Sequence, residues 1–289
     1  MPVFAFLFLI IAAPALAFTA ERGTFQHGGH ERIHYFFAPA DAGPQTPLVI
    51  ALHGMGGNAK ELRFGIGLTE ALAEIGFAVV YPQGLRLPEG SRHWNAGFDF
   101  VAVDDLGYLA ALARHLITQN GLSTDRTVVF GISMGGFMAY HMACHGGLTL
   151  SSIVVVAGSM HPDDLERCPG RGKASLLHIH GARDALIPYD GGQHWALEDL
   201  DQVPVPQVIE AWVHAQRAVV SPPLVDHARV HPARYLDALG RETQFLTLPD
   251  FGHDWPSETT AGYRALDDVA GFLARHRLPE RRFAQGGWE

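Results

Sequence analysis

Residues 127–143 read TVVFGISMGGFMAYHMA, and this stretch decides the fold of the chain. It places the pattern G-x-S-x-G around Ser133, between an apolar run and a segment with the composition of a helix. A serine between strand and helix sits on a sharp turn, where glycines tolerate the backbone angles and let neighbouring chain approach. Ser133 is therefore a candidate nucleophile. The pentapeptide alone leaves a second interpretation open, a glycine-rich loop with an incidental serine.

Apolar runs and helix-length segments alternate along the rest of the chain. This alternation predicts an α/β fold with a mainly parallel central sheet flanked by helices on both faces. Ligands of such sheets bind beyond the carboxyl ends of the strands. Residues 218–240 are irregular and are expected to form an excursion near that site. We expect strands at 32–37, 48–52, 77–81, 127–131, 153–156, 175–180 and 243–248, and helices at 58–74, 104–120, after Ser133 and at 257–275.

The first 17 residues have the form of a secretory signal peptide. Residues 3–13 are apolar, and Ala15-Leu16-Ala17 matches an A-x-A cleavage site. The alternative is a membrane anchor, but Pro14 interrupts the run, which is shorter than the ~20 residues that span a bilayer. We therefore expect export to the periplasm or the extracellular space, no stable membrane insertion, and one catalytic domain over residues 18–289.

Composition argues against a nucleic-acid partner. The 289 residues are 47% hydrophobic and 18% charged, as in globular proteins, and the net charge of −9 argues against binding nucleic acid. The oligomeric state stays open. The chain has two cysteines, Cys144 and Cys168, and an even number in an exported protein permits a disulfide.

A nucleophilic serine needs a histidine base and a carboxylate that orients it. Asp184 and His253 each follow a predicted strand, in the order Ser…Asp…His that this kind of site requires. Asp250 and Asp254 compete with Asp184 for the orienting role. Asp254 is adjacent to His253 in sequence and cannot easily present its carboxylate to that ring.

A serine that attacks a carbonyl group also needs donors for the oxyanion that develops. The backbone N–H of Met134, directly after the serine, is one candidate. Residues 53–57, HGMGG, follow an early strand and supply the second, the N–H of Met55. The alternative is a phosphate-binding loop, which would carry the pattern G-K-[ST], and this loop does not.

Several other residues are further candidates for the site. Trp94, Trp195 and Trp255 could line a site or pack in the core. Asp104 and Asp105 stand at a predicted helix start, where capping explains carboxylates better than acid–base chemistry does. A further pair, His141 and His145, has a spacing that can bind zinc, but a zinc site needs a third protein ligand and often a glutamate, so we expect no metal. His178 and His180 alternate on a strand and look structural.

Together these motifs resemble the secreted polyhydroxybutyrate depolymerase, feruloyl esterase and acetyl xylan esterase group of the α/β-hydrolase superfamily. The resemblance implies an α/β-hydrolase fold with Ser133, Asp184 and His253 as the triad. One departure is Met55, where relatives often carry a cysteine, so one of their disulfides is missing. A second is residues 195–248, which match poorly. The matching stretches are residues 52–57, 94–97, 103–109, 131–144, 180–192 and 252–256.

The sequence therefore predicts a serine esterase that forms an acyl-enzyme, with a small-molecule or polymeric ester as substrate and no cofactor. Acyl transfer or peptide cleavage on the same triad is an alternative, and a binding module without activity is another. A polyester, a feruloyl ester and an acetyl ester remain equally open as substrates.

Overall fold

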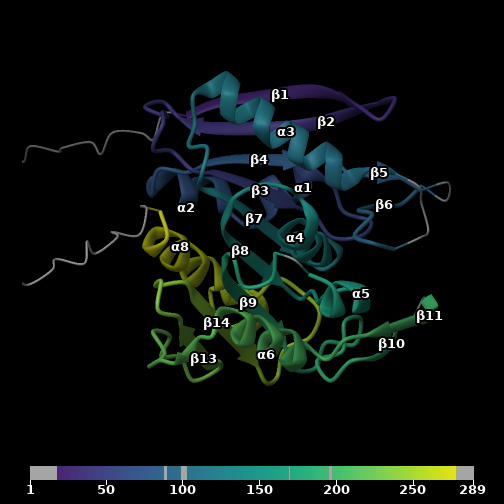
Figure 1. Cartoon of the computed structure of the whole chain (residues 1–289), viewed down its shortest axis with the longest axis vertical. Helices are drawn as coiled ribbons and strands as arrows, with labels where there is room; N and C mark the ends of the chain where they lie inside the picture. Colours follow the sequence, from purple (N-terminus) through teal and green to yellow (C-terminus); the bar gives the residue numbers. More distant parts are fainter. Residues whose placement is uncertain (1–17, 88–89, 99–102, 169, 195–196, 278–289) are drawn as a thin grey trace, which may run out of the picture.

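The computed structural model describes residues 18–87, 90–98, 103–168, 170–194 and 197–277, so the expected signal peptide and Trp195 lie outside the described residues. Its core is a ten-stranded sheet of order β1-β2-β4-β3-β7-β8-β9-β14-β13-β12 (Figure 1). The strands are β1 (Phe18–His27), β2 (His30–Pro39), β3 (Leu48–Leu52), β4 (Ala78–Pro82), β5 (Leu85–Arg86), β6 (Arg92–His93), β7 (Thr127–Ile132), β8 (Leu150–Val156), β9 (Ser175–Gly181), β10 (Gly192–His194), β11 (Leu197–Gln202), β12 (Val219–Val220), β13 (His231–Leu236) and β14 (Glu242–Leu248). The helices are α1 (Ala59–Gly65), α2 (Leu68–Glu74), α3 (Asp105–Asn120), α4 (Met134–His145), α5 (Pro162–Glu166), α6 (Val205–Gln216), α7 (Glu258–Ala261) and α8 (Ala265–Arg275).

The middle of the sheet is parallel and its edges are antiparallel. β4, β3, β7, β8, β9 and β14 pair in parallel, whereas β1 and β2 close one edge and β13 and β12 the other in antiparallel pairs. The parallel strands point the same way. The residues that follow β3, β7, β9 and β14 therefore lie together at the carboxyl ends of these strands. The predicted α/β architecture is confirmed.

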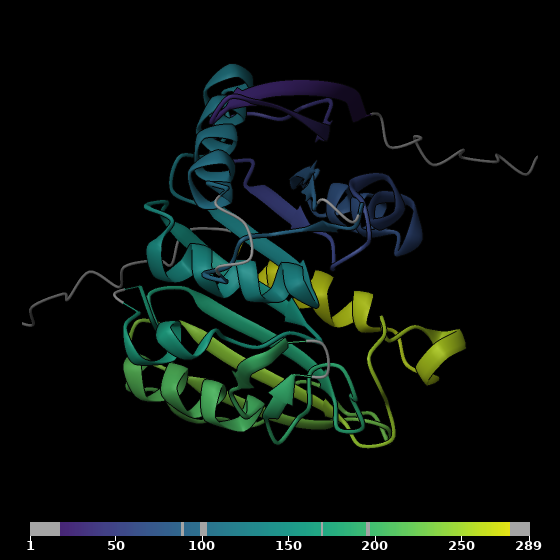
Figure 2. The same ribbon diagram turned by 90° about the vertical axis from the view of Figure 1, so that its right-hand side faces the viewer.

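Helices cover both faces of the sheet (Figure 2): α3, α4 and α6 lie on one face, and α1, α2 and α8 on the other. Successive residues of a strand point to opposite faces. Val129 accordingly packs with Tyr108 and Met138 on the first face, while Val128 packs with Phe272 on the second. Strands buried on both faces read as continuous apolar runs, which is why the sequence pattern located them well.

The differences from the predicted elements arise at glycines and at the sheet edges. The helix expected over 58–74 is two helices, α1 and α2, separated by Gly67 in the left-handed conformation (φ 70°). The helix expected at 257–275 is likewise α7 and α8, because Gly262 (φ 59°) ends the first. Residues 218–240 contain the edge strands β12 and β13 and do not line the cavity described below. The prediction that they form an excursion near the site was therefore wrong.

The two cysteines form a disulfide, which confirms the bridge that the sequence permitted. Cys144 lies in the last turn of α4, and Cys168 follows α5. The bond therefore ties the helix after Ser133 to the segment beyond the next strand. Within the described residues, no helix is both long and apolar enough to cross a membrane.

Candidate active site

Ser133 sits on a strained turn between β7 and α4. Its backbone has φ 56° and ψ −120°, a region that non-glycine residues rarely adopt. The glycines around it are required by space. A Cβ on Gly131 would lie 2.0 Å from the carbonyl oxygen of Gly135, and a Cβ on Gly135 would lie 2.3 Å from that of Leu52. The incidental-serine interpretation therefore fails on geometry, since the glycines allow strands and helix to close around a projecting Ser133.

The structure brings Ser133, His253 and Asp184 into one hydrogen-bonded chain. His253 Nε2 lies 2.9 Å from Ser133 Oγ, and His253 Nδ1 lies 2.7 Å from Asp184 Oδ2. Asp184 is buried, and its Oδ1 accepts the backbone N–H groups of Leu186 (2.9 Å) and Ile187 (2.8 Å). Both carboxylate oxygens are thus held, and the Nδ1–H of His253 is directed at one of them.

The two competing carboxylates are engaged elsewhere. Asp250 pairs with the exposed guanidinium of Arg183 at 2.5 Å. Asp254 accepts the backbone N–H of Trp255 at 2.7 Å. Neither carboxylate is bonded to His253, so Asp184 holds the orienting position.

A close approach of two loops sets the position of His253. A Cβ on Gly181, at the end of β9, would lie 2.4 Å from the carbonyl oxygen of Phe251 and 2.6 Å from that of Gly252. The N–H of Arg183 donates to the Phe251 carbonyl at 2.9 Å, which joins the same two loops. Because these loops carry Asp184 and His253, the absence of a side chain at Gly181 is what lets the two residues meet. Sequence reasoning did not single out Gly181 for this role.

The loop of residues 53–57 lies against the serine turn. A Cβ on Gly54 would meet Ser133 Cβ at 3.3 Å, and the N–H groups of Gly56 and Gly57 donate to the carbonyls of Arg92 (2.7 Å) and Gly54 (3.2 Å). Met55 stands at the tip of this loop and, with Met134, lines the cavity beside Ser133. Met134 is also the first residue of α4, and amides at that position have no acceptor within their own helix.

His53 holds this loop from behind, a role that the sequence pattern did not reveal. Its Nε2 accepts the N–H of Gly84 at 3.0 Å, so its Nδ1 carries the proton and donates to the Gly54 carbonyl at 2.7 Å. Burial lowers the pKa of His53 to about 4, which keeps the ring neutral. Trp94 Nε1 donates to the His53 carbonyl at 2.9 Å, and Trp94 is fully buried. Trp94 therefore supports the loop and does not line the cavity.

A cavity of about 560 Å³ opens at Ser133. This volume is in the range of small-molecule sites, which are mostly apolar with a few polar groups. Trp255 lines the cavity, which was one of its two possible roles, lining a site or packing in the core. The other lining residues are His53, Gly54, Met55, Gly57, Asn58, Glu61, Leu62, Phe98, Ile132, Ser133, Met134, Phe137, Ala157, Leu186, Ile187, His253 and Asp254.

A buried row of polar side chains backs Asp184. His180 Nε2 lies 2.9 Å from the Ile187 carbonyl, which can only accept, so Nε2 is protonated and Nδ1 accepts. His178 Nε2 therefore donates to His180 Nδ1 (3.2 Å), and Tyr140 Oη donates to His178 Nδ1 (2.7 Å). Burial lowers the pKa of both histidines, so both are neutral. His180 Nε2 also lies 3.5 Å from Asp184 Oδ2, which places a structural histidine directly behind the site.

The two aspartates at the start of α3 have structural roles. Asp104 caps α3 by accepting the N–H of Gly107 at 2.7 Å, as the capping interpretation predicted. Asp105 is buried and pairs with Arg32 at 2.6 Å, and it also accepts the N–H of Asn95 at 2.8 Å. Neither residue lines the cavity.

Comparison with known proteins assigns the family. The model of the family described as phospholipase/carboxylesterase matches residues 34–198. The feruloyl esterase C of Emericella nidulans is 28% identical to this chain over 184 residues, and the match covers 60% of this chain and 62% of the relative. The bifunctional acetylxylan esterase/xylanase of Neocallimastix patriciarum is 24% identical over 164 residues, and that match covers 57% of this chain and 23% of the relative. The chain thus spans less than two thirds of the length of these curated relatives.

A solved structure with the same architecture is the acetyl xylan esterase from Aspergillus awamori. It superposes with a TM-score of 0.58 over 88% of this chain and 99% of that one, at 14% identity, which shows a shared fold. The family match covers more than half of the chain and includes both the 53–57 loop and the serine turn. The chain therefore belongs to the phospholipase/carboxylesterase family of the α/β-hydrolase superfamily.

Proposed function

We propose that the protein is a serine esterase that hydrolyses carboxylic esters through an acyl-enzyme. Ser133 Oγ attacks the ester carbonyl carbon, and His253 Nε2, 2.9 Å away, takes its proton. Asp184 holds the ring in the tautomer with the proton on Nδ1 and stabilises the imidazolium that forms.

The oxyanion of the tetrahedral intermediate is stabilised by the N–H groups of Met55 and Met134. A donor of this kind typically contributes ~3 kcal/mol to transition-state stabilisation. Collapse of the intermediate breaks the bond to the alcohol oxygen, which takes the proton from His253. Water, activated by the same histidine, then attacks the acyl-enzyme and releases the acid.

One observation carries this proposal: the continuous chain from Ser133 through His253 to Asp184 stands at the wall of an apolar cavity next to the 53–57 loop. Family membership supports the same reaction class.

For the substrate we propose a feruloyl or acetyl ester of a polysaccharide, or a polyhydroxyalkanoate ester. The apolar lining, with the rings of Phe98, Phe137 and Trp255, suits an apolar or aromatic portion of such an ester. The names of the relatives, a feruloyl esterase and an acetylxylan esterase, favour the first two. We further propose that residues 1–17 direct export and are removed, which mass spectrometry of the product exported from its host would reveal as a chain starting at Phe18.

Ser133→Ala tests the reaction. Loss of the nucleophile is expected to lower p-nitrophenyl butyrate turnover on the order of 10⁴-fold or more, and to abolish labelling by a fluorophosphonate probe. Ser151→Ala is the control, because Ser151 lies at the amino end of β8, far along the strand from Val156, whose carbonyl accepts the Ser133 N–H. Near-normal turnover in Ser133→Ala would exclude the assignment.

A substrate panel separates the remaining possibilities. Methyl ferulate, acetylated xylan and polyhydroxybutyrate should be assayed in parallel, together with amides matched to the esters. We expect ester turnover to exceed amide turnover. Faster cleavage of the amides would favour a peptidase on the same three residues, and transfer of the acyl group to added alcohols in preference to water would favour an acyltransferase.

A further inference from the structure

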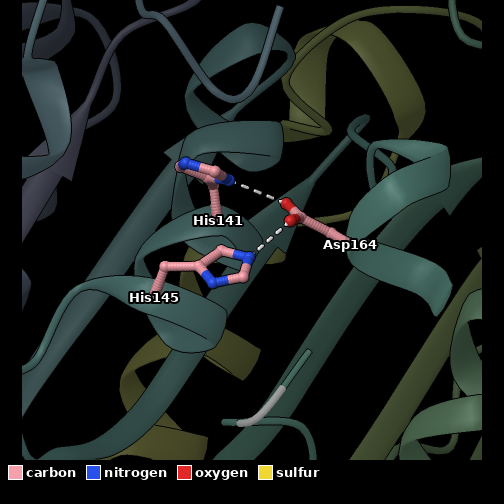
Figure 3. Close-up of side chains that lie close together, drawn as sticks. All are labelled: His141, His145 and Asp164. Atoms are coloured by element: carbon pink, nitrogen blue, oxygen red, sulfur yellow. Dashed lines mark hydrogen bonds and ion pairs between the residues drawn. The ribbon is translucent and has the colours of Figure 1, made fainter. Parts of the chain in front are cut away.

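A second cluster of polar side chains lies in the carboxyl-terminal half of α4, where α5 packs on that helix. His141 and His145 are one helical turn apart and share a face of α4, and Asp164 of α5 lies between them (Figure 3). His141 Nδ1 is 2.9 Å from Asp164 Oδ2, and His145 Nε2 is 2.8 Å from Asp164 Oδ1. One nitrogen from each ring thus converges on one carboxylate.

The structure supplies the third ligand that the sequence pattern lacked. In the sequence, the spacing of His141 and His145 can bind zinc, but no third protein ligand stands beside them. Asp164 lies 19 residues beyond His145, on a different helix, so only the packing of α5 on α4 brings it there. The three donor atoms lie within 4.8 Å of one another.

We propose that His141, His145 and Asp164 form a zinc site. Two imidazoles and a carboxylate are a donor set that suits Zn²⁺, with metal–ligand distances of about 2.0–2.2 Å. Tetrahedral ligation at those distances separates donor atoms by about 3.3 Å. The nitrogen–oxygen separations of 2.8 and 2.9 Å are a few tenths shorter, and the three donor atoms lie within 4.8 Å of one another, so local side-chain movements would bring them around the ion.

The surroundings of the cluster fit a cation that is reached from solvent. Asp164 is buried, with 5% of its side chain exposed, whereas the rings of His141 and His145 are 16% and 32% exposed. Arg171 donates to the backbone carbonyl of Asp164, not to its carboxylate. The ion would enter beside the more exposed ring, and water would complete its coordination.

The position of the site indicates a structural role. His141 lies eight residues after Ser133, about 12 Å along the helix axis at 1.5 Å per residue, so the ion is remote from the reacting atoms. It would hold α5 against α4 beside the disulfide Cys144–Cys168, which joins the same two segments. α5 begins after His161, whose ring contacts Phe98 in the cavity wall, so the bound ion would also stiffen that wall.

Zinc titration of the full-length protein, first stripped with EDTA, tests the proposal. Calorimetry is expected to show one saturable site at micromolar or lower zinc, and saturating zinc is expected to raise the melting temperature. Both cysteines are in the disulfide, so no thiolate competes for the ion. Asp164→Asn keeps the size and shape of the side chain, and His145→Gln changes the most exposed ligand. Each is expected to weaken the site at least tenfold and to remove the thermal shift.

Two control variants locate the binding. His214→Gln removes an exposed histidine at the end of α6 and should leave the affinity unchanged. Ser133→Ala should also bind zinc normally, so the site is tested independently of ester hydrolysis. The proposal would be overturned if wild type shows no saturable site, or if His145→Gln, folded by circular dichroism, binds zinc as wild type does.

Discussion

Replacing Gly181 by alanine should separate His253 from Ser133 without changing the identity of any residue of the proposed triad. The new Cβ would stand 2.4 Å from the Phe251 carbonyl oxygen and 2.6 Å from that of Gly252, against an ordinary contact of 3.4 Å or more. Both obstacles are backbone atoms, so the loop that carries His253 must move by about 1 Å. A misplacement of this size typically costs on the order of 10²-fold in rate.

The assay is the kcat for p-nitrophenyl butyrate, measured at a temperature where circular dichroism shows both proteins folded. We expect a fall of about 100-fold in kcat with a much smaller change in KM, because the cavity lining is retained. Gly252→Ala is the matched control: its Cβ would meet nothing closer than 3.7 Å, so its kcat should stay within a few-fold of wild type. Near-wild-type kcat in Gly181→Ala, or equal losses in both variants, would refute the reasoning.

Two further predictions concern stability. Burial alone would raise the pKa of Glu242, but hydrogen bonds from His276, Arg275 and Arg234 outweigh it and lower the pKa from 4.5 to about 2. The resulting stability, at most about 3 kcal/mol, is fully present above pH 4.5 and is lost as the pH falls towards 2. Urea unfolding at pH 7 and pH 3 should therefore show a smaller difference between wild type and Glu242→Gln at pH 3, and an equal difference would contradict the pairing. Replacing both cysteines of the Cys144–Cys168 bridge by serine should cost about 3 kcal/mol, from the 24-residue separation, and lower the melting temperature by several degrees, whereas an unchanged melting curve in non-reducing buffer would show that the bridge is not formed.

The parallel core of the sheet was predictable because its strands are buried on both faces. Leu48–Leu52 and residues 128–130 are apolar without interruption, and that pattern needs no knowledge of their neighbours. The edge strands were harder. β12 consists of two exposed valines, and the pairing of β13 with β14 depends on a register that no local pattern encodes.

Some residues of the candidate site could likewise be predicted from local sequence, and others only from the fold. Ser133 could be named from its glycines because the constraint on that turn is local, and Asp184 and His253 could be named from their places after predicted strands. Only the fold shows that Asp184 lies beside His253 whereas Asp250 pairs with Arg183. The role of His53 behind the 53–57 loop depends on its contact with Gly84, 31 residues further along the chain.

The sequence by itself determined the strand-turn-helix around Ser133, the buried strands of a mainly parallel sheet and the residue types of the candidate site, because each depends on short-range sterics or on burial periodicity. Only the tertiary structure decided which groups meet. Gly181 leaves room for two backbone carbonyl groups that lie some 70 residues away in sequence. Asp164 lies beside His141 and His145 because α5 packs on α4. Such contacts join segments whose spacing in the sequence does not indicate that they will meet, so the contacts form only when the chain folds.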